Sequence, residues 1–226
     1  MEGGQIAIDG KALRGSRSGE TSHLHAVSAW ACEAGITLAQ AFVGEKTNEI
    51  TAIPELLEML NLKGAIVTID AMGTQDTGHD RSETRQIMVC HDLDWMDQDI
   101  RKDWKGLSSV IMVHRHTLLA AGKTRSGTSY YMSSLQGVPA LELLGYIRGH
   151  WSIENRCHWV LDAIYREDHN QTRDRQSAAN HSTLRRMALN GHNPMPFEGK
   201  KRKSLPKREL RAACDESYLE QLLSLI

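Results

Sequence analysis

Short apolar runs separated by turn-rich segments fill the first third of the chain. They predict strands at residues 5–9, 24–31 and 36–43, the last two joined by a short glycine-bearing turn typical of a hairpin. Apolar residues at helical spacing predict a helix over residues 48–62, and a further apolar run predicts a strand at 65–69. A strand, a helix and a strand in this order favour two parallel strands covered by helices.

The remainder of the chain changes from strand-like to helical patterns. The strand-like runs, which predict an antiparallel subdomain, are residues 84–90, 109–116 and 129–133. The helical patterns cover residues 140–149, 152–165, 177–190 and 208–225. We therefore expect an α/β fold in three parts: residues 1–75, residues 76–135 with the antiparallel strands, and a helical part over residues 136–226.

Composition limits the class of protein. The 226 residues are 40% hydrophobic, enough for a buried core, and the net charge of -1 excludes a chain that is basic throughout. Four cysteines stand far apart without a CxxC pair, which argues against a structural zinc site and fits a reducing compartment. We see no signal peptide and no membrane-spanning run, so the expected location is cytoplasmic.

Two aspartates stand directly after apolar strands, and they are the first candidates for chemistry. Asp9 follows the first predicted strand, and Asp70 follows the strand at 65–69. Ligands of open α/β sheets bind at the carboxyl ends of strands, and parallel neighbours lie ~4.8 Å apart, so both carboxylates can hold one cation. An aspartate in this position also serves as a simple turn former, and that alternative stays open for each residue.

Glu154 is the candidate third acid, in the first turn of a predicted helix. Its plainer role there is a carboxylate favoured by the helix dipole. Three acids together suit a phosphoryl-transfer site with two ions ~3.5–4 Å apart. Oxygen ligands favour Mg²⁺ or Mn²⁺ as the ion.

Nine segments, in order along nearly the whole chain, resemble the H-repeat-associated proteins, a family of DDE transposases from bacterial insertion sequences. The segments are residues 6–16, 45–55, 66–73, 79–85, 92–95, 130–134, 150–155, 158–162 and 166–168. The resemblance implies a ribonuclease-H-like fold with an antiparallel β insertion and a helical C-terminus. It implies that Asp9, Asp70 and Glu154 are the catalytic, metal-binding triad for Mg²⁺-dependent cleavage and transfer of DNA strands. The DNA partner would be the insertion-sequence ends, and a homodimer is one option for the assembly.

Two departures from the family pattern bear on activity. In the family pattern a further domain precedes the first aspartate, whereas Asp9 is the ninth residue here. The family pattern also has a long stretch after the position of Gln75, and this stretch is missing here. Without the strand in that stretch, the strand at 65–69 becomes an exposed edge that is apolar on both faces. We therefore expect a transposase-like protein that is defective, with a catalytically inactive DNA-binding remnant as the alternative.

Other polar groups have two interpretations each. His150, Glu154, His158 and Asp162 recur every fourth residue, which suits either a transition-metal site or a polar face lining the active site. A basic C-terminal segment suits phosphate contacts or a solvated tail. Its DNA-binding candidates are Lys200, Lys201, Arg202, Lys203, Lys207 and Arg208. Lys11 is also close to Asp9 in sequence and could face DNA.

A thermal melt tests the expectation of a defective protein. We expect a low melting midpoint and no strand transfer on insertion-sequence ends, because the lost strand exposes an apolar edge. Mn²⁺ should raise the midpoint only if the acids still form a site, since a ligand specific for the folded state stabilises it, and Asp70→Ala should then remove the response. A cooperative melt at high temperature combined with strand transfer would contradict this expectation.

Overall fold

The computed structural model describes residues 4–17, 22–43, 49–60, 62, 64–69, 81–119, 122–197 and 201–226. The chain divides into two compact units. One unit combines Met1–Ala71 with Arg148–Ile226, and the other is Met72–Ile147. Among the helices within the described ranges, none is long and apolar enough to cross a membrane.

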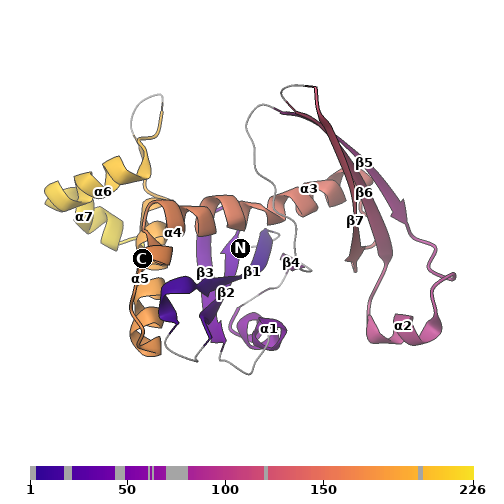
Figure 1. Cartoon of the computed structure of the whole chain (residues 1–226), viewed down its shortest axis with the longest axis horizontal. Helices are drawn as coiled ribbons and strands as arrows, with labels where there is room; N and C mark the ends of the chain where they lie inside the picture. Colours follow the sequence, from indigo (N-terminus) through magenta and orange to yellow (C-terminus); the bar gives the residue numbers. More distant parts are fainter. Residues whose placement is uncertain are drawn as a thin grey trace. The chain divides into compact units, whose positions relative to one another are not determined.

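A four-stranded sheet forms the centre of the first unit (Figure 1). Its strands are β1 (Gln5–Leu13), β2 (Leu24–Ala31), β3 (Ile36–Val43) and β4 (Ile66–Ile69), in the order β3-β2-β1-β4. β2 pairs antiparallel with both β1 and β3, whereas β1 and β4 are parallel. The predicted hairpin is confirmed, and the parallel pair joins β4 to β1 rather than to β3, the strand that precedes it in sequence.

β1 is longer than the pattern predicted. The predicted end at Asp9 was wrong, because pairing with β2 continues as far as Leu13, opposite Leu24. A lysine inside this extension, Lys11, is buried because acidic side chains surround it. A single 3-10 turn, η1 (Arg14–Ser16), then ends the strand.

The two faces of the sheet carry different helices because side chains of a strand alternate between faces. Ile6 and Ile8 of β1 point to the face covered by α1 (Glu49–Glu58), where they pack with Leu56. Ala7 points to the opposite face and belongs to the cluster that contains Ile153, Cys157 and Leu161, so the two helical layers enclose the strand.

The second helical layer is a succession of short and long elements. It contains η2 (Glu154–His158), a π-helical turn, then α4 (Trp159–Ala163), η3 (Glu167–His169) and α5 (Arg175–His192). The Asp174 side chain caps α5 by accepting the Ser177 N–H at 2.8 Å.

Two C-terminal helices replace the single helix predicted over residues 208–225. They are α6 (Leu205–Cys214) and α7 (Glu216–Leu223). Asp215 interrupts the helix, because it is extended and its carboxylate accepts the N–H of Tyr218 at 3.1 Å. The resulting bend lets Tyr218 pack with Met195.

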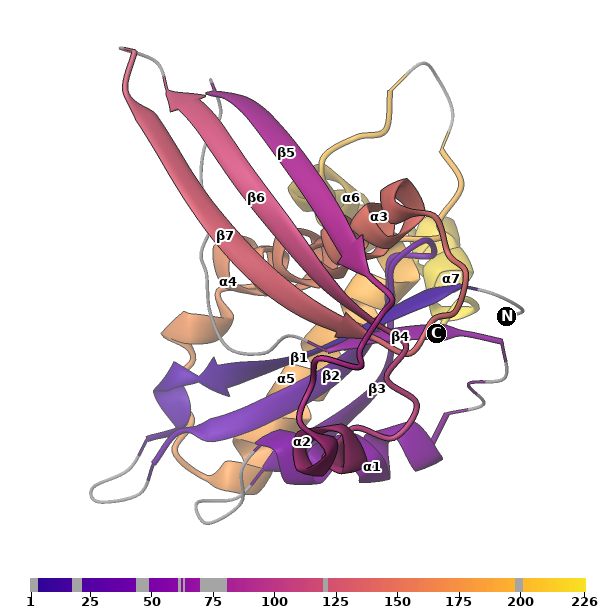
Figure 2. The same cartoon turned by 90° about the vertical axis from the view of Figure 1, so that its right-hand side faces the viewer.

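The second unit contains the antiparallel strands, longer than the pattern predicted (Figure 2). Its elements are β5 (Arg81–Cys90), α2 (Gln98–Asp103), β6 (Ser109–Leu119), β7 (Thr124–Ser133) and most of α3 (Ala140–His150). The sheet order is β5-β6-β7. Ile111 and Val113 of β6 pack against Leu143 of α3, which buries one face of this sheet.

β4 lies at one edge of the four-stranded sheet within the described part of the chain. The edge was predicted, and the side chains of β4 agree with it. Residues of a parallel strand are usually buried on both faces, whereas Ile69 is 51% exposed. The position of the expected deletion, directly after Gln75, lies outside the described residues.

Gly15 marks a close approach between η1 and the chain after η3. A Cβ at this position would lie 1.3 Å from the carbonyl oxygen of Asn170. We predict that Gly15→Ala lowers the free energy of unfolding by about 3 kcal/mol, because backbone must move to relieve the overlap. Urea unfolding measures the change. Gly145→Ala is the matched control, since a methyl group there meets nothing within 4 Å and an alanine favours the helix. Equal stability of the two variants would contradict the close approach.

Candidate metal centre

The period of two along β1 directs Asp9 toward the second helical layer. Asp9 has the same parity as Ala7, so its side chain leaves the sheet on the face that packs against η2 and α4. Its backbone pairs with that of Ser28 in β2, and its carboxylate accepts the Gly10 N–H at 2.9 Å. The strand therefore fixes one carboxylate beneath the helix that carries Glu154.

A π-helical turn presents Glu154 and His158. The Trp159 N–H donates to the Glu154 carbonyl, five residues earlier, so the helix is locally wider than an α-helix. Such turns frequently occur at functional sites. The indole of Trp30 in β2 is fully buried and donates to the Ser152 hydroxyl at 3.2 Å, which ties the beginning of this helix to the sheet. Trp30 therefore packs in the core of the first unit.

Asp9, Glu154 and His158 converge on one point. His158 Nδ1 lies 3.2 Å from Asp9 Oδ2 and 3.4 Å from Glu154 Oε2, and the three candidate ligand atoms are all within 4.8 Å of one another. The His158 side chain is buried, whereas that of Glu154 is 56% exposed. The site is thus anchored inside the protein and open on the glutamate side.

The charges in this cluster support each other. Burial alone would raise the pKa of Asp9, but the hydrogen bond from His158, the positive charge of that ring and the Gly10 N–H together hold the pKa below its ordinary value. Burial would lower the pKa of His158, yet its hydrogen bonds to Asp9 and Glu154 raise it. The Asp9 carboxylate is therefore held in the ionised form that a cation ligand needs.

Asp70, the third predicted site residue, lies outside the described residues. The register of the neighbouring strands is described up to the preceding residue: Ile8 pairs with Ile69 in the parallel ladder. Asp9 follows Ile8 in sequence and Asp70 follows Ile69, so each aspartate comes directly after one residue of this pair. His150 Nδ1 lies 2.9 Å from the Thr68 hydroxyl, which connects the end of α3 to β4.

The donor set fits a divalent cation that prefers oxygen. Two carboxylates with an imidazole beside them suit Mn²⁺, and the carboxylates alone suit Mg²⁺. The four-residue stripe weighed as a transition-metal site does not converge as a whole within the described residues. His150 Nδ1 contacts the Thr68 hydroxyl and Asp162 contacts Lys11, whereas Glu154 and His158 offer ligand atoms within 4.8 Å of that of Asp9.

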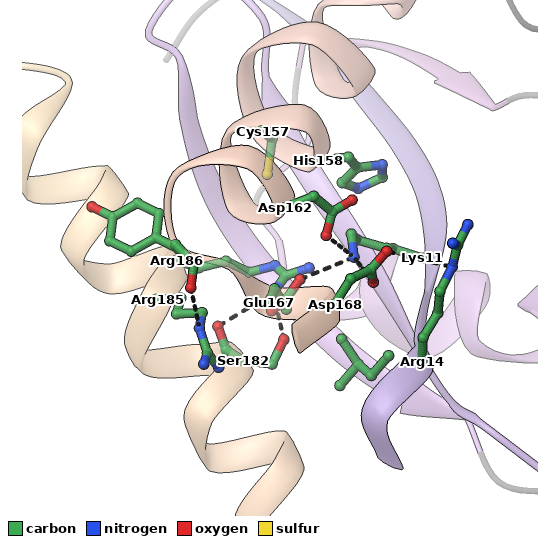
Figure 3. A network of polar contacts seen from close by, with 12 residues as sticks. Lys11, Arg14, Cys157, His158, Asp162, Glu167, Asp168, Ser182, Arg185 and Arg186 are labelled. Atoms are coloured by element: carbon green, nitrogen blue, oxygen red, sulfur yellow. Dashed lines mark hydrogen bonds and ion pairs between the residues drawn. The ribbon is translucent and has the colours of Figure 1, made fainter. Parts of the chain in front are cut away.

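Lys11 lies in a buried polar network rather than on a DNA-facing surface (Figure 3). Its ammonium is 2.7 Å from Asp162 and 3.3 Å from both Glu167 and Asp168. Arg186 of α5 extends the network, because its guanidinium binds Glu167 at 3.1 Å. The same guanidinium donates to the hydroxyl of Ser28 at 3.3 Å.

The sequence signal for this network is weak, because its members come from β1, α4, η3 and α5. One lysine faces three carboxylates in this network. Burial would lower the pKa of Lys11, but the acids raise it. Burial raises the pKa of Asp162; Lys11 opposes this rise, and the charges of Asp168 and Glu167 add to it.

The predicted DNA-binding cations separate into two groups. Arg202 donates to the carbonyls of Asn193 at 2.6 Å and Met195 at 3.1 Å, and both Arg202 and Arg208 donate to the His192 carbonyl at the end of α5. These arginines therefore serve a structural role at a helix C-terminus. The exposed members of the set are Lys201, Lys203 and Lys207. Lys200 lies outside the described residues.

Comparison with known proteins identifies the family. Residues 2–190 match the model of the transposase DDE domain, so the chain belongs to that family. Two Escherichia coli proteins named as transposases are similar over most of the chain. YncI of strain O157:H7 is 31% identical over 99% of this chain and 70% of its own length. The H repeat-associated protein YhhI of strain K12 is 31% identical over 97% of this chain and 71% of its own length. The resemblance to the H-repeat-associated proteins is confirmed.

One solved structure also matches, that of the piggyBac transposase synaptic complex with hairpin DNA. It shares 12% identity and a TM-score of 0.46, over 99% of this chain and 54% of the other.

The alignment with YncI is longer than this chain, because its 277 positions exceed the 226 residues of the chain by 51. The relative therefore has at least 51 positions inside the aligned region that have no counterpart here.

His192 makes the C-terminal helices sensitive to acid. Burial, with the charges of Arg208 and Arg202 nearby, lowers the pKa of His192 to about 4. The unfolded chain binds a proton near pH 6.5 and the folded chain only near pH 4, so stability is full above pH 6.5 and falls as the pH drops toward 4. We predict a loss of about 2 kcal/mol between pH 8 and pH 5.

Urea unfolding at a series of pH values measures this loss, with His192→Gln as the comparison. The glutamine variant should be less stable at pH 8 and should lose about 2 kcal/mol less on acidification, because it has no imidazole to protonate. Parallel pH profiles for the two proteins would contradict the assignment.

Proposed function

We propose that this chain is a ribonuclease-H-like DDE transposase domain, descended from enzymes that cut and join DNA strands during insertion-sequence transposition. Asp9, Asp70 and Glu154 hold its divalent cation, Mg²⁺ or Mn²⁺. Membership of the DDE family supports the proposal. The observation that carries it is the convergence of Asp9 and Glu154, 145 positions apart in sequence, on the single nitrogen of His158.

Each residue has a defined task in this proposal. Asp9 is the half-buried anchor, held by the Gly10 N–H and kept ionised by its neighbours. Glu154 is the exposed carboxylate that would coordinate the cation from the solvent side. When bound, the cation activates the attacking oxygen and stabilises the leaving oxygen of a phosphodiester. The protein supplies fixed carboxylates and uses no covalent nucleophile of its own.

The exposed lysines of the C-terminal segment are the proposed contacts to DNA phosphates. Lys201, Lys203 and Lys207 are exposed, whereas Arg202 and Arg208 bind backbone carbonyls. Phosphate contacts of this kind depend strongly on salt, because each one releases counterions. Within the predicted set, therefore, the lysines carry DNA affinity and the arginines carry stability.

We further propose that the chain is defective in complete transposition. The 51 or more positions that YncI has and this chain lacks support this, as does the exposed edge at β4. The rival function, a catalytically inactive DNA-binding remnant, is favoured by the same observations. The two functions differ in whether the acidic cluster still binds a cation.

Three assays on one set of variants decide between them. We expect Mn²⁺ binding by wild type, measured by calorimetry, and a loss of at least about tenfold in Asp9→Asn and Glu154→Gln, because each removes a charged ligand. We expect salt-dependent binding to DNA, weakened in Lys203→Ala/Lys207→Ala. Strand transfer on insertion-sequence ends should be absent.

The remaining outcomes have separate meanings. DNA binding without any Mn²⁺ binding would replace the proposal with the inactive remnant. DNA binding that is unchanged in Lys203→Ala/Lys207→Ala, with normal stability, would overturn the role of the lysines. Efficient strand transfer would overturn the defect.

A further inference from the structure

We propose that Lys11 is a positioning residue for the cation site, because its ion pair with Asp162 fixes the register between β1 and the helix that presents Glu154. This inference rests on the proposed metal function and adds a residue that holds no cation itself. Lys11 and Asp162 lie 2.7 Å apart, closer than the contacts of Lys11 with its other two acids.

The spacing of strand and helix carries the argument. Asp9 and Lys11 lie two residues apart on β1, a separation of ~6.6 Å along the strand. His158 and Asp162 lie four residues apart on the helix, a rise of ~6.0 Å. The two steps match, so Asp9 contacts His158 at the same register at which Lys11 contacts Asp162.

Two contacts at matched spacing define an alignment that one contact does not. The Asp9–His158 contact fixes the helix to β1 at one point, and the Trp30–Ser152 hydrogen bond ties the beginning of the helix to β2. Glu154 is on the exposed side of that contact, and the described contact that orients its carboxylate is the one with His158 Nδ1. The second contact, at Lys11, stops the helix from sliding by a turn of ~5.4 Å, which would remove Glu154 from Asp9.

Lys11 is itself held firmly enough to act in this way. Its side chain is buried, with 9% exposure, and its ammonium also contacts Glu167 and Asp168 on η3. Arg186 neutralises part of the acidic charge by binding Glu167. Lys11 therefore keeps two carboxylate partners even when Asp162 is changed.

Asp162 and Asp168 provide a matched pair of substitutions. Both are partly exposed carboxylates that contact Lys11, but Asp162 lies on the continuous helical segment with Glu154 and His158, whereas Asp168 lies on the separate turn η3. Asp162→Asn and Asp168→Asn each remove one negative charge beside the same lysine, and Asp168→Asn also removes the partner of the exposed Arg14. A difference in Mn²⁺ affinity between the two variants then reports a change in the register of the helix against β1, rather than the loss of a charge beside Lys11.

Mn²⁺ titration followed by electron paramagnetic resonance compares the two variants with wild type. We expect Asp162→Asn to weaken Mn²⁺ binding about tenfold, the size usual for residues that orient metal ligands, and Asp168→Asn to stay within about twofold. Equal losses in both variants, or no loss in Asp162→Asn, would overturn the inference.

Hydrogen exchange at backbone amides gives a second readout that needs no metal. Asp162→Asn should accelerate exchange over residues 154–163, and Asp168→Asn should leave this segment protected. If wild type does not bind Mn²⁺, the proposed metal function fails. The hydrogen-exchange difference between the two variants then still tests whether Lys11 fixes the register between β1 and the helix. Unchanged protection in Asp162→Asn would then reject the role of Lys11.

Discussion

The alternation of side chains along β1 is the constraint from which the rest of the first unit follows. Ile6 and Ile8 enter the core beneath α1, and the residues between and after them face the other helical layer. Asp9 and Lys11 therefore leave the strand on the same side, one as an anion and one as a cation. The helix above supplies a complement to each, with His158 over Asp9 and Asp162 over Lys11.

Burial of charge explains why the helices and the sheet meet in one arrangement. Removing one partner of a buried ion pair leaves a costly unpaired charge, so a shifted helix is strongly disfavoured. The same logic operates at the C-terminus, where Arg202 and Arg208 bind carbonyls that the end of α5 would otherwise leave unsatisfied. Cations that resemble a nucleic-acid surface in the sequence are thus partly structural.

The sequence predicted most of the strands and helices and part of the site. Apolar periodicity predicted the hairpin of β2 and β3, the parallel strand β4 and the antiparallel strands of the second unit. It predicted β1 too short, because a lysine in a strand resembles a loop residue until its acidic partners are known. It also merged α6 and α7, because the capping role of Asp215 depends on the extended backbone there.

For the site, the chain order of motifs predicted Asp9 and Glu154, and the structure brings these two together through His158. It could not reveal the network of Lys11, Glu167 and Arg186, since these residues meet only through the packing of three elements, β1, η3 and α5. Asp70 stays a prediction. Local patterns identify carboxylates that follow strands, whereas long-range ion pairs depend on the packing of distant elements.

A crystal structure of the protein grown with Mn²⁺, with the ion located by its anomalous scattering, tests the central claim most directly. The account predicts a peak between the carboxylates of Asp9 and Glu154, with Asp70 as a further ligand. A folded protein that shows no peak there, or one in which Asp70 lies far from Asp9, would contradict it.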